Sequence, residues 1–296
     1  MLKVAVYGNC QAEALQRILS YFPEQFNVVA LRPVHLLDRN QPQELYSKIR
    51  EVDYFLYQPV SAGYGDLASN AVIDQLQSSA TAISFPSIYF DAFQCRQIYL
   101  RDPGGARISS PIGDYHDDLI VNMFLRGASC KDIVAALDGL LMSREDCEAN
   151  LAQSLNYFSA RESTLDIKLS QYIRDNYFQK LLFYTFNHPS NEILFRVFSE
   201  FLCLADIRKL GQPNKIINLD RDFLSNYYFQ SDLTDPGVFA FQGFQEYGSN
   251  RTKYTREDVV SSYLLEYSRF GHEKLAVAYE YSLRRRLKVL SNQLAE

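Results

Sequence analysis

The stretch LKVAVYGNCQAEALQRILSYF, residues 2–22, decides the fold of this chain. Its first part, residues 2–7, is a short apolar run with β-branched and aromatic members, which is typical of a buried strand. After Gly8 the apolar residues recur at the spacing of a buried helix face, at Ala14, Leu15, Ile18, Leu19 and Phe22. The stretch therefore predicts a strand, a tight turn and a helix, with Cys10 at the turn.

This position gives Cys10 two possible roles. A side chain at the carboxyl end of a parallel strand lies at the sheet edge where α/β proteins bind ligands. The amino terminus of the following helix offers partial positive charge and N–H groups, which favour a thiolate and can hold an oxyanion. Cys10 is therefore a candidate nucleophile, and the alternative is a small buried core residue, as most free cysteines are.

The first hundred residues alternate between strand-like and helix-like patterns. Further strands are predicted at 26–31, 53–57 and 81–85, and helices at 43–52 and 65–77. Strands joined by helical crossovers favour a parallel sheet with both faces covered. We expect the carboxyl edge of this sheet to bring together Cys10, Gln58 and the segment after Phe85.

The rest of the chain adds helices to this sheet. The apolar run 181–186 predicts a fifth strand, and helices are expected at 114–125, 131–142, 145–158, 165–172, 256–270 and 272–292, two of them opened by the capping boxes Ser143/Asp146 and Thr255/Asp258. The aromatic-rich segment 206–254 is expected to be an ordered, irregular layer. We therefore predict one α/β domain over 1–296, with a core of 1–100 and 181–205, a helical insertion at 101–180 and a helical C-terminal extension at 206–296.

Composition excludes several classes of function. A net charge of −5 without a basic region argues against nucleic-acid binding. No apolar run is long enough for a membrane span or a signal peptide, so we expect a cytoplasmic protein. The five cysteines form no CxxC pair and the four histidines show no ligand spacing, which predicts neither disulfides nor a metal site. No GxGxxG or Walker loop indicates a nicotinamide cofactor or a P-loop NTPase.

His188 is the candidate general base. It lies between the apolar run 181–186 and a predicted helix that begins near Pro189. A helix amino terminus disfavours the imidazolium form, so the ring is expected to be neutral and able to accept a proton. The other interpretation is a structural histidine.

Four blocks of the sequence resemble a known family. They are GNCQA (8–12), FPSIYFDAF (85–93), PIGDYHDDLI (111–120) and FYTFNHPSNEIL (183–194). In this order they resemble the blocks of the WcbI family of polysaccharide biosynthesis, which is similar to SGNH (GDSL-type) hydrolases with Cys in place of Ser. The resemblance covers about the first two thirds of the chain. It implies an SGNH-like, flavodoxin-like fold with a mainly parallel, five-stranded sheet, and acyl transfer from coenzyme A or acetyl-CoA to a sugar hydroxyl in polysaccharide or capsule biosynthesis.

The resemblance and the expected sheet edge together propose site residues. The catalytic candidates are Cys10, His188 and His116, and the candidates for oxyanion or substrate binding are Gly8, Asn9, Gln11, Gln58 and Asn187. Arg101 and Arg107 are candidate contacts for the phosphates of coenzyme A. Thr185 stands where SGNH triads carry an acid, so no orienting carboxylate is assigned. Two residues keep a structural alternative: His116 as a solvated helix cap, and Gln58 as a loop residue bonded to backbone.

Three functions remain open from the sequence. Acyl transfer can proceed through an acyl-Cys10 intermediate, or directly with His188 activating the sugar hydroxyl. The same residues would serve an SGNH-like esterase or thioesterase if water replaced the sugar. A protein of this fold that only binds a glycan or a partner protein is the third possibility.

Overall fold

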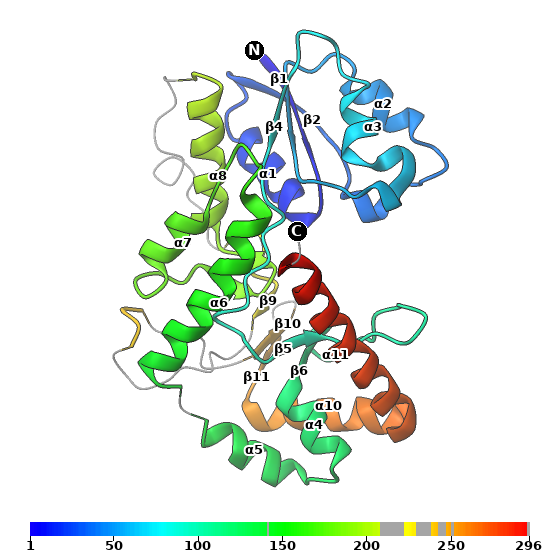
Figure 1. The fold of residues 1–296 in the computed structure, drawn as a ribbon, viewed down its shortest axis with the longest axis vertical. Helices are drawn as coiled ribbons and strands as arrows, with labels where there is room; N and C mark the ends of the chain where they lie inside the picture. Colours follow the sequence, from blue (N-terminus) through cyan, green and yellow to red (C-terminus); the bar gives the residue numbers. More distant parts are fainter. Residues whose placement is uncertain (141, 208–221, 229–237, 242–246, 250–251, 295–296) are drawn as a thin grey trace. The chain divides into compact units, whose positions relative to one another are not determined.

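The computed structural model describes residues 1–140, 142–207, 222–228, 238–241, 247–249 and 252–294 (Figure 1). The chain divides into two compact units. The first unit comprises Met1–Ile88, Arg161–Ile173 and Pro189–Leu224, and the second comprises Tyr89–Ala160, Arg174–His188 and Ser225–Glu296. The expectation that these units form one domain stays a prediction.

The first unit is built on a four-stranded sheet, drawn in blue and cyan in Figure 1. Its strands are β1 (Leu2–Tyr7), β2 (Phe26–Val29), β3 (Tyr54–Tyr57) and β4 (Thr81–Ser84). They lie in the order β2-β1-β3-β4, and every neighbouring pair is parallel. The four predicted strands and their helical crossovers are thus confirmed.

Helices of the first unit cover this sheet. They are α1 (Cys10–Ser20), α2 (Gln43–Ile49), α3 (Ser69–Ile73), α8 (Asn191–Leu204) and the 3-10 turns η1 (Val34–Leu36) and η2 (Ala62–Leu67). Aromatic rings join α8 to the amino-terminal part of the chain: Phe198 stacks on Phe22 with ring centroids 5.3 Å apart, and Phe201 lies 6.0 Å from Phe26. The predicted helix 65–77 is shorter than expected and begins only at Ser69, because the backbone of Ala68 is extended, with φ −65° and ψ 148°, and separates η2 from α3.

The predicted fifth strand, 181–186, is wrong. The strand β7 (Phe183–Thr185) pairs with β8 (His188–Pro189) and not with the parallel sheet. Phe186 follows β7, and its N–H donates to Gln97 Oε1 while its carbonyl accepts from the N–H of Phe90. The run is apolar because Leu182, Phe183 and Phe186 are all buried, and burial alone does not identify a central strand.

The second unit combines short antiparallel strands with helices. Its strands include β5 (Gln97–Tyr99), paired with β6 (Tyr115–Asp117), and the three-stranded sheet of β9 (Tyr227–Tyr228), β10 (Tyr247–Ser249) and β11 (Thr252–Tyr254). Its helices include α4 (Asp118–Leu125), α5 (Cys130–Asp138), α10 (Arg256–Phe270) and α11 (His272–Leu294). Two further helices contain residues of both units: α6 (Arg144–Glu162) and α7 (Ser170–Asn176).

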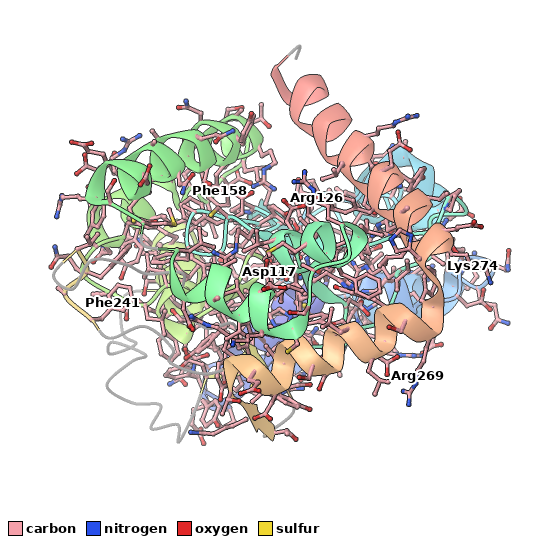
Figure 2. All side chains as sticks on the ribbon, turned by 90° about the horizontal axis from the view of Figure 1, so that it is seen from below. Asp117, Arg126, Phe158, Phe241, Arg269 and Lys274 are labelled. Carbon is pink, nitrogen blue, oxygen red and sulfur yellow. The ribbon has the colours of Figure 1, made fainter. Side chains whose placement is uncertain are left out.

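Local capping explains where these helices begin. The predicted capping boxes Ser143/Asp146 and Thr255/Asp258 are both present. The helix expected from 114 begins only at Asp118, because residues 115–117 pair with β5 and the carboxylate of Asp117 accepts from the N–H of Leu119. Asp117 is labelled in Figure 2. The helix expected at 165–172 is displaced to Ser170–Asn176, where the carboxylate of Glu162 accepts from the N–H of Leu169, just before the helix, and from that of Ser170, its first residue.

The predicted irregular layer at 206–254 falls largely on residues 208–221, 229–237, 242–246 and 250–251, which lie outside the described residues. Its described parts contribute aromatic side chains to the second unit. Phe239 lies 5.3 Å from Tyr177 and 5.9 Å from Phe93 between ring centroids. The expectation for the rest of the layer stays a prediction.

Candidate functional site

Cys10 is the first residue of α1, directly after the turn that ends β1. Asn9 caps this helix, and its side-chain oxygen accepts from the N–H of Gln11 at 2.8 Å. Cys10 is partly exposed. The predicted strand, turn and helix are therefore confirmed, and the thiol is placed at both the sheet's carboxyl edge and a helix amino terminus.

Gln58 holds this turn from the next strand. It follows β3 at the same sheet edge and is only 2% exposed. Its side-chain oxygen accepts from the N–H of Asn9 at 2.9 Å, and its side-chain nitrogen donates to Gln11 Oε1 at 2.7 Å and to the carbonyl of Pro86 at 3.2 Å. The amide of Gln58 is thus bonded to the Cys10 turn and to the segment after β4, and not to the backbone of its own loop.

Gln11 ties the turn to residues 86–88. Its side chain donates to the carbonyl of Ile88 at 2.6 Å and accepts from the N–H of Ile88 at 2.9 Å. Asn9 adds a bond from its side-chain nitrogen to Ser87 Oγ at 3.2 Å. The predicted gathering of Cys10, Gln58 and the segment after Phe85 at one sheet edge is confirmed, and buried amide groups fix its geometry.

His188 belongs to a cluster of side chains in the second unit. Tyr115 Oη is 2.7 Å from Asn187 Oδ1 and 3.3 Å from His188 Nε2. Thr185 Oγ1 also donates to Asn187 Oδ1, at 3.1 Å. The rings of Tyr115 and Tyr227 pack on the imidazole with centroids 5.8 and 6.1 Å away. The cluster therefore contains two predicted site residues, Asn187 and His188, together with Thr185.

Tyr115 is the member of this cluster that the sequence analysis missed. It lies in the block PIGDYHDDLI, next to the histidine that drew attention. Neighbouring side chains of a strand point to opposite faces, so in β6 only one of Tyr115 and His116 can face His188. Strand pairing in this block, had it been recognised, would have made Tyr115 a second candidate.

His116 is enclosed in the second unit. It is 0% exposed, its Nε2 lies 2.9 Å from the carbonyl of Ile108, and its Nδ1 lies 2.9 Å from Tyr267 Oη. A carbonyl can only accept, so Nε2 carries the proton and Nδ1 accepts from the tyrosine hydroxyl. Burial lowers the pKa of His116 to about 4, which keeps the ring neutral near pH 7. Its predicted catalytic role stays a prediction, and its contacts hold β6 to α10.

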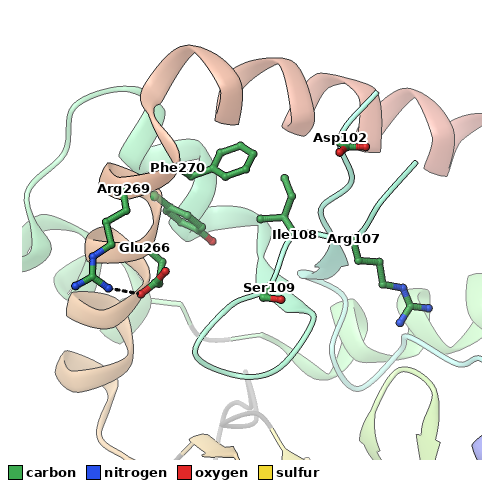
Figure 3. Close-up of a pocket in the computed structure, with 8 residues that line it drawn as sticks. Asp102, Arg107, Ile108, Ser109, Glu266, Arg269 and Phe270 are labelled. Carbon is green, nitrogen blue, oxygen red and sulfur yellow. Dashed lines mark hydrogen bonds and ion pairs between the residues drawn. The ribbon is translucent and has the colours of Figure 1, made fainter. Parts of the chain in front are cut away.

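Arg101 and Arg107 lie in the connection between β5 and β6. Arg107 Nη1 donates a hydrogen bond to Asp114 Oδ2 at 2.8 Å. The guanidinium of Arg107 also lies over the ring of Tyr99, with its central carbon 4.1 Å from the ring centroid. Arg101 donates to the carbonyl of Gly105 at 2.7 Å. Arg107 also lines a pocket of about 420 Å³ (Figure 3), whose other residues are Asp102, Ile108, Ser109, Glu266, Tyr267, Arg269 and Phe270. Their predicted contact with coenzyme A stays a prediction.

Two further properties concern only the described part of the chain. No helix there is both long and apolar enough to cross a membrane. Nor do three or more His, Cys, Asp or Glu side chains gather there in a group that could hold a metal ion.

Comparison with known proteins agrees with this α/β fold. The sequence profile of the polysaccharide biosynthesis enzyme WcbI matches residues 3–209. The chain is thus a polysaccharide biosynthesis enzyme by class, and it belongs to the WcbI family.

One solved structure is similar over the whole chain. It is described as WcbI, a novel polysaccharide biosynthesis enzyme, in its native form without a disulfide bond between coenzyme A and one of its cysteines. The TM-score is 0.81 at 22% sequence identity, with 100% of this chain and 99% of that chain covered. This likeness shows a shared fold. No curated protein matches the sequence.

Proposed function

We propose that this protein transfers an acyl group, such as acetyl, from coenzyme A to a hydroxyl of a carbohydrate during polysaccharide biosynthesis. The observation that carries the proposal is Cys10 at the first position of α1, at the carboxyl edge of a parallel sheet. Membership of the WcbI family supplies the polysaccharide context. The solved WcbI is described with reference to coenzyme A and a cysteine, which supports a thioester as the donor.

The proposed chemistry has two steps. Cys10 Sγ bonds to the thioester carbonyl carbon, the carbon–sulfur bond to coenzyme A breaks, and coenzyme A leaves with the proton that Cys10 gave up. A carbohydrate hydroxyl then bonds to the acyl carbon and the bond to Cys10 breaks. The hydroxyl proton passes to His188, which acts as the general base and returns it to Cys10 through solvent.

The surrounding residues have supporting roles in this proposal. Gly8, Asn9, Gln11 and Gln58 hold the turn that places Cys10 at the amino terminus of α1, whose partial positive charge favours the developing oxyanion. Asn187 holds the cluster around His188. Arg101 and Arg107 are proposed contacts for the phosphates of coenzyme A. An SGNH-like ancestry and a cytoplasmic site of action fit the cysteine turn and the donor, and both are part of the proposal.

Direct transfer is the variant of this mechanism that omits acyl-Cys10. In it His188 activates the carbohydrate hydroxyl, which attacks the thioester itself. Intact-mass spectrometry after incubation with acetyl-CoA separates the two routes. An added acetyl group that peptide mapping assigns to Cys10 establishes the covalent route, and an unmodified chain that still acetylates the acceptor establishes the direct one.

The test of the proposal measures release of coenzyme A from acetyl-CoA by chromatography, with and without a panel of oligosaccharide acceptors. We expect acceptor-dependent release that Cys10→Ala abolishes or strongly reduces and that His188→Gln lowers by roughly a hundredfold, the scale for losing a general base. Cys203→Ala, an exposed cysteine of α8, is the matched control and should be fully active. Release that needs no acceptor would identify a thioesterase, and unchanged activity of both site variants would overturn the proposal.

A further inference from the structure

We infer that the groove between the loop 108–111 and helix α10 binds neighbouring neutral sugar units of a carbohydrate chain. The loop and the helix both belong to the second unit. The inference rests on the proposed function only in identifying this carbohydrate as the acyl acceptor.

Two adjoining cavities form the groove. One has a volume of about 420 Å³ (Figure 3) and the other a volume of about 280 Å³. Ser109 of the loop and Glu266 of the helix line both cavities. Because sites for single small molecules usually have about 300–1,000 Å³, two cavities in a row offer room for an extended ligand.

One face of α10 forms a wall of this groove. Its lining residues recur at the spacing of a helix face: Ser262, Leu265, Glu266, Arg269 and Phe270. Leu265 is 52% exposed and Phe270 is half-buried, so each offers an apolar surface, one in each cavity. Residues five positions apart lie about 7–8 Å apart along a helix axis, which is more than the width of one sugar ring. The two surfaces therefore suit the C–H faces of neighbouring sugar units.

An ion pair lies on the same helix face between these two surfaces. Arg269 Nη1 donates to Glu266 Oε1 at 2.8 Å, and both side chains are exposed. A carboxylate can accept several hydrogen bonds and a guanidinium can donate several, so the pair can both accept from and donate to sugar hydroxyls. Each side chain also holds the other in place before a sugar binds, which lowers the entropic cost of binding.

The buried side chain of His116 joins the two walls of the groove. Its Nε2 donates to the carbonyl of Ile108 and its Nδ1 accepts from Tyr267 Oη, each at 2.9 Å. Ile108 and Tyr267 both line the larger cavity, one from the loop and one from the helix. The loop is also closed on itself, because the N–H of Ser110 donates to the carbonyl of Gly113 at 2.6 Å. The groove is thus formed before a ligand arrives.

The charges of the groove favour a neutral ligand. The larger cavity is lined by two acidic and two basic side chains: Asp102, Glu266, Arg107 and Arg269. The guanidinium of Arg107 is hydrogen-bonded to Asp114 and points away from Phe270 in the view of Figure 3. A ligand rich in phosphate would therefore meet no excess of positive charge here, whereas the hydroxyls of a neutral sugar can use both kinds of side chain.

The first experiment measures hydrogen–deuterium exchange of the full chain by mass spectrometry. The probes are monosaccharides and trisaccharides of glucose, mannose, galactose and rhamnose. With at least one trisaccharide we expect slower exchange in the peptides that cover 107–111 and 262–270, because a ligand stabilises the segments that it contacts. The matching monosaccharide should protect them less, since it covers only one apolar surface. Coenzyme A and a pool of synthetic peptides are the competing probes, and neither should slow exchange in these segments.

Glu266→Ala tests the polar contacts of the groove. It should raise the Kd of the protecting trisaccharide roughly tenfold, the scale for losing hydrogen bonds to a charged group. Glu257→Ala makes the same substitution in the first turn of α10, outside the groove, and should leave this Kd unchanged. Phe270→Leu removes the aromatic ring and should also weaken binding, so it replaces Glu266→Ala if that variant does not fold.

Kinetics with the same trisaccharide as acceptor connect the groove to the reaction. In Glu266→Ala the KM for the acceptor should rise roughly tenfold, in step with the Kd. The KM for acetyl-CoA should stay within about twofold, because the groove holds the acceptor and not the donor.

The outcomes separate the groove from the proposed function. Protection of the groove by no trisaccharide, or by coenzyme A or the peptides instead, overturns the inference, and this measurement on the native chain stands however the variants behave. Acyl transfer with the same acceptor KM in Glu266→Ala and wild type overturns the inference and leaves the proposed function intact. Protection by a trisaccharide that Glu266→Ala weakens, in a protein that transfers no acyl group, supports the carbohydrate groove and removes the proposed function.

Discussion

The side-chain amide of Gln58 occupies the space where any residue larger than glycine at position 8 would place its β-carbon. Such an atom would meet the oxygen, Cδ and Cγ of Gln58 at or inside the closest distances seen between non-bonded atoms. Moving Gln58 aside would cost free energy, because its side-chain amide is hydrogen-bonded to Asn9, Gln11 and Pro86. Gly8, two residues before the candidate nucleophile Cys10, is thus required by Gln58, which lies fifty positions later in the chain.

Gly8→Ala should therefore destabilise the fold and disorder the cysteine turn. We expect a loss of about 1–3 kcal/mol, the usual range for overpacking a tight interior, measured by urea unfolding. Gly63→Ala is the control, since a β-carbon there meets only Ser61 Oγ at 3.7 Å. Equal stability of the two variants would show that Gln58 adapts and that the close approach has no cost.

Cys10 should be alkylated by iodoacetamide faster than the other cysteines at neutral pH. The helix amino terminus favours its thiolate, and we expect a rate roughly tenfold above that of an ordinary exposed thiol such as Cys203. Cys147 should be the slowest, because burial raises its pKa to about 11. Peptide mapping over time gives the order, and a Cys10 rate no higher than that of Cys203 would contradict an activated thiol.

His116 should make the protein less stable in mild acid. Its pKa in the folded protein is about 4, below the ordinary value of 6.5, because the buried ring is hard to charge. Between these values the unfolded chain binds the proton and the folded chain does not. The contribution of the neutral His116 to the free energy of unfolding is therefore fully present above pH 6.5. It falls as the pH drops toward 4, by up to about 3 kcal/mol.

The control for this prediction is His116→Gln, which does not titrate and can still donate to Ile108 and accept from Tyr267. Urea unfolding at several pH values between 4 and 7 compares the two proteins, so that the contributions of carboxylates cancel. The stability of the wild type should drop more steeply toward acid than that of the variant. If the difference between their free energies of unfolding is constant with pH, His116 becomes protonated in the folded state as readily as in the unfolded chain.

Asp117 should be the most sensitive helix cap of the second unit. Its side chain is 3% exposed, its carboxylate accepts from the first turn of α4, and it forms an ion pair with Arg96 at 3.1 Å. Asp117→Ala leaves a largely buried guanidinium without this partner, so we expect a loss of about 3 kcal/mol. Asp132→Ala, which breaks the exposed capping box of α5, should cost much less. Thermal unfolding of both variants makes the comparison.

Local patterns predicted the first unit well. The change from a strand period to a helix period at Gly8 located β1, the turn and α1, and the crossovers located the other parallel strands. The gathering of Gln58 with Cys10 could also be predicted, because parallel strands end at one edge. The partners of the Gln58 amide could not, since a glutamine after a strand has several loops within reach of its side chain.

Prediction failed where one sequence pattern is compatible with more than one structure. The run 181–186 has the composition of a central strand, but Leu182, Phe183 and Phe186 are apolar because the second unit buries them. In the block around 115–117 the titratable side chain of His116 attracted the functional interpretation, whereas the neighbouring tyrosine lies beside His188. Sequence composition does not reveal which of two adjacent residues faces the cluster until the strand is recognised.

The alternation of Tyr115 and His116 along β6 also limits how this part of the gene can evolve. Substitutions elsewhere in the loop that precedes β6 leave the two faces of the strand unchanged. A deletion or insertion of one codon that shifted β6 against β5 would turn both side chains over, placing the histidine beside His188 and the tyrosine toward Tyr267. Such a protein would keep nearly the same composition and lose both hydrogen-bond networks at once, so the loop between Arg101 and Asp114 should vary in length among relatives only by changes that preserve this register.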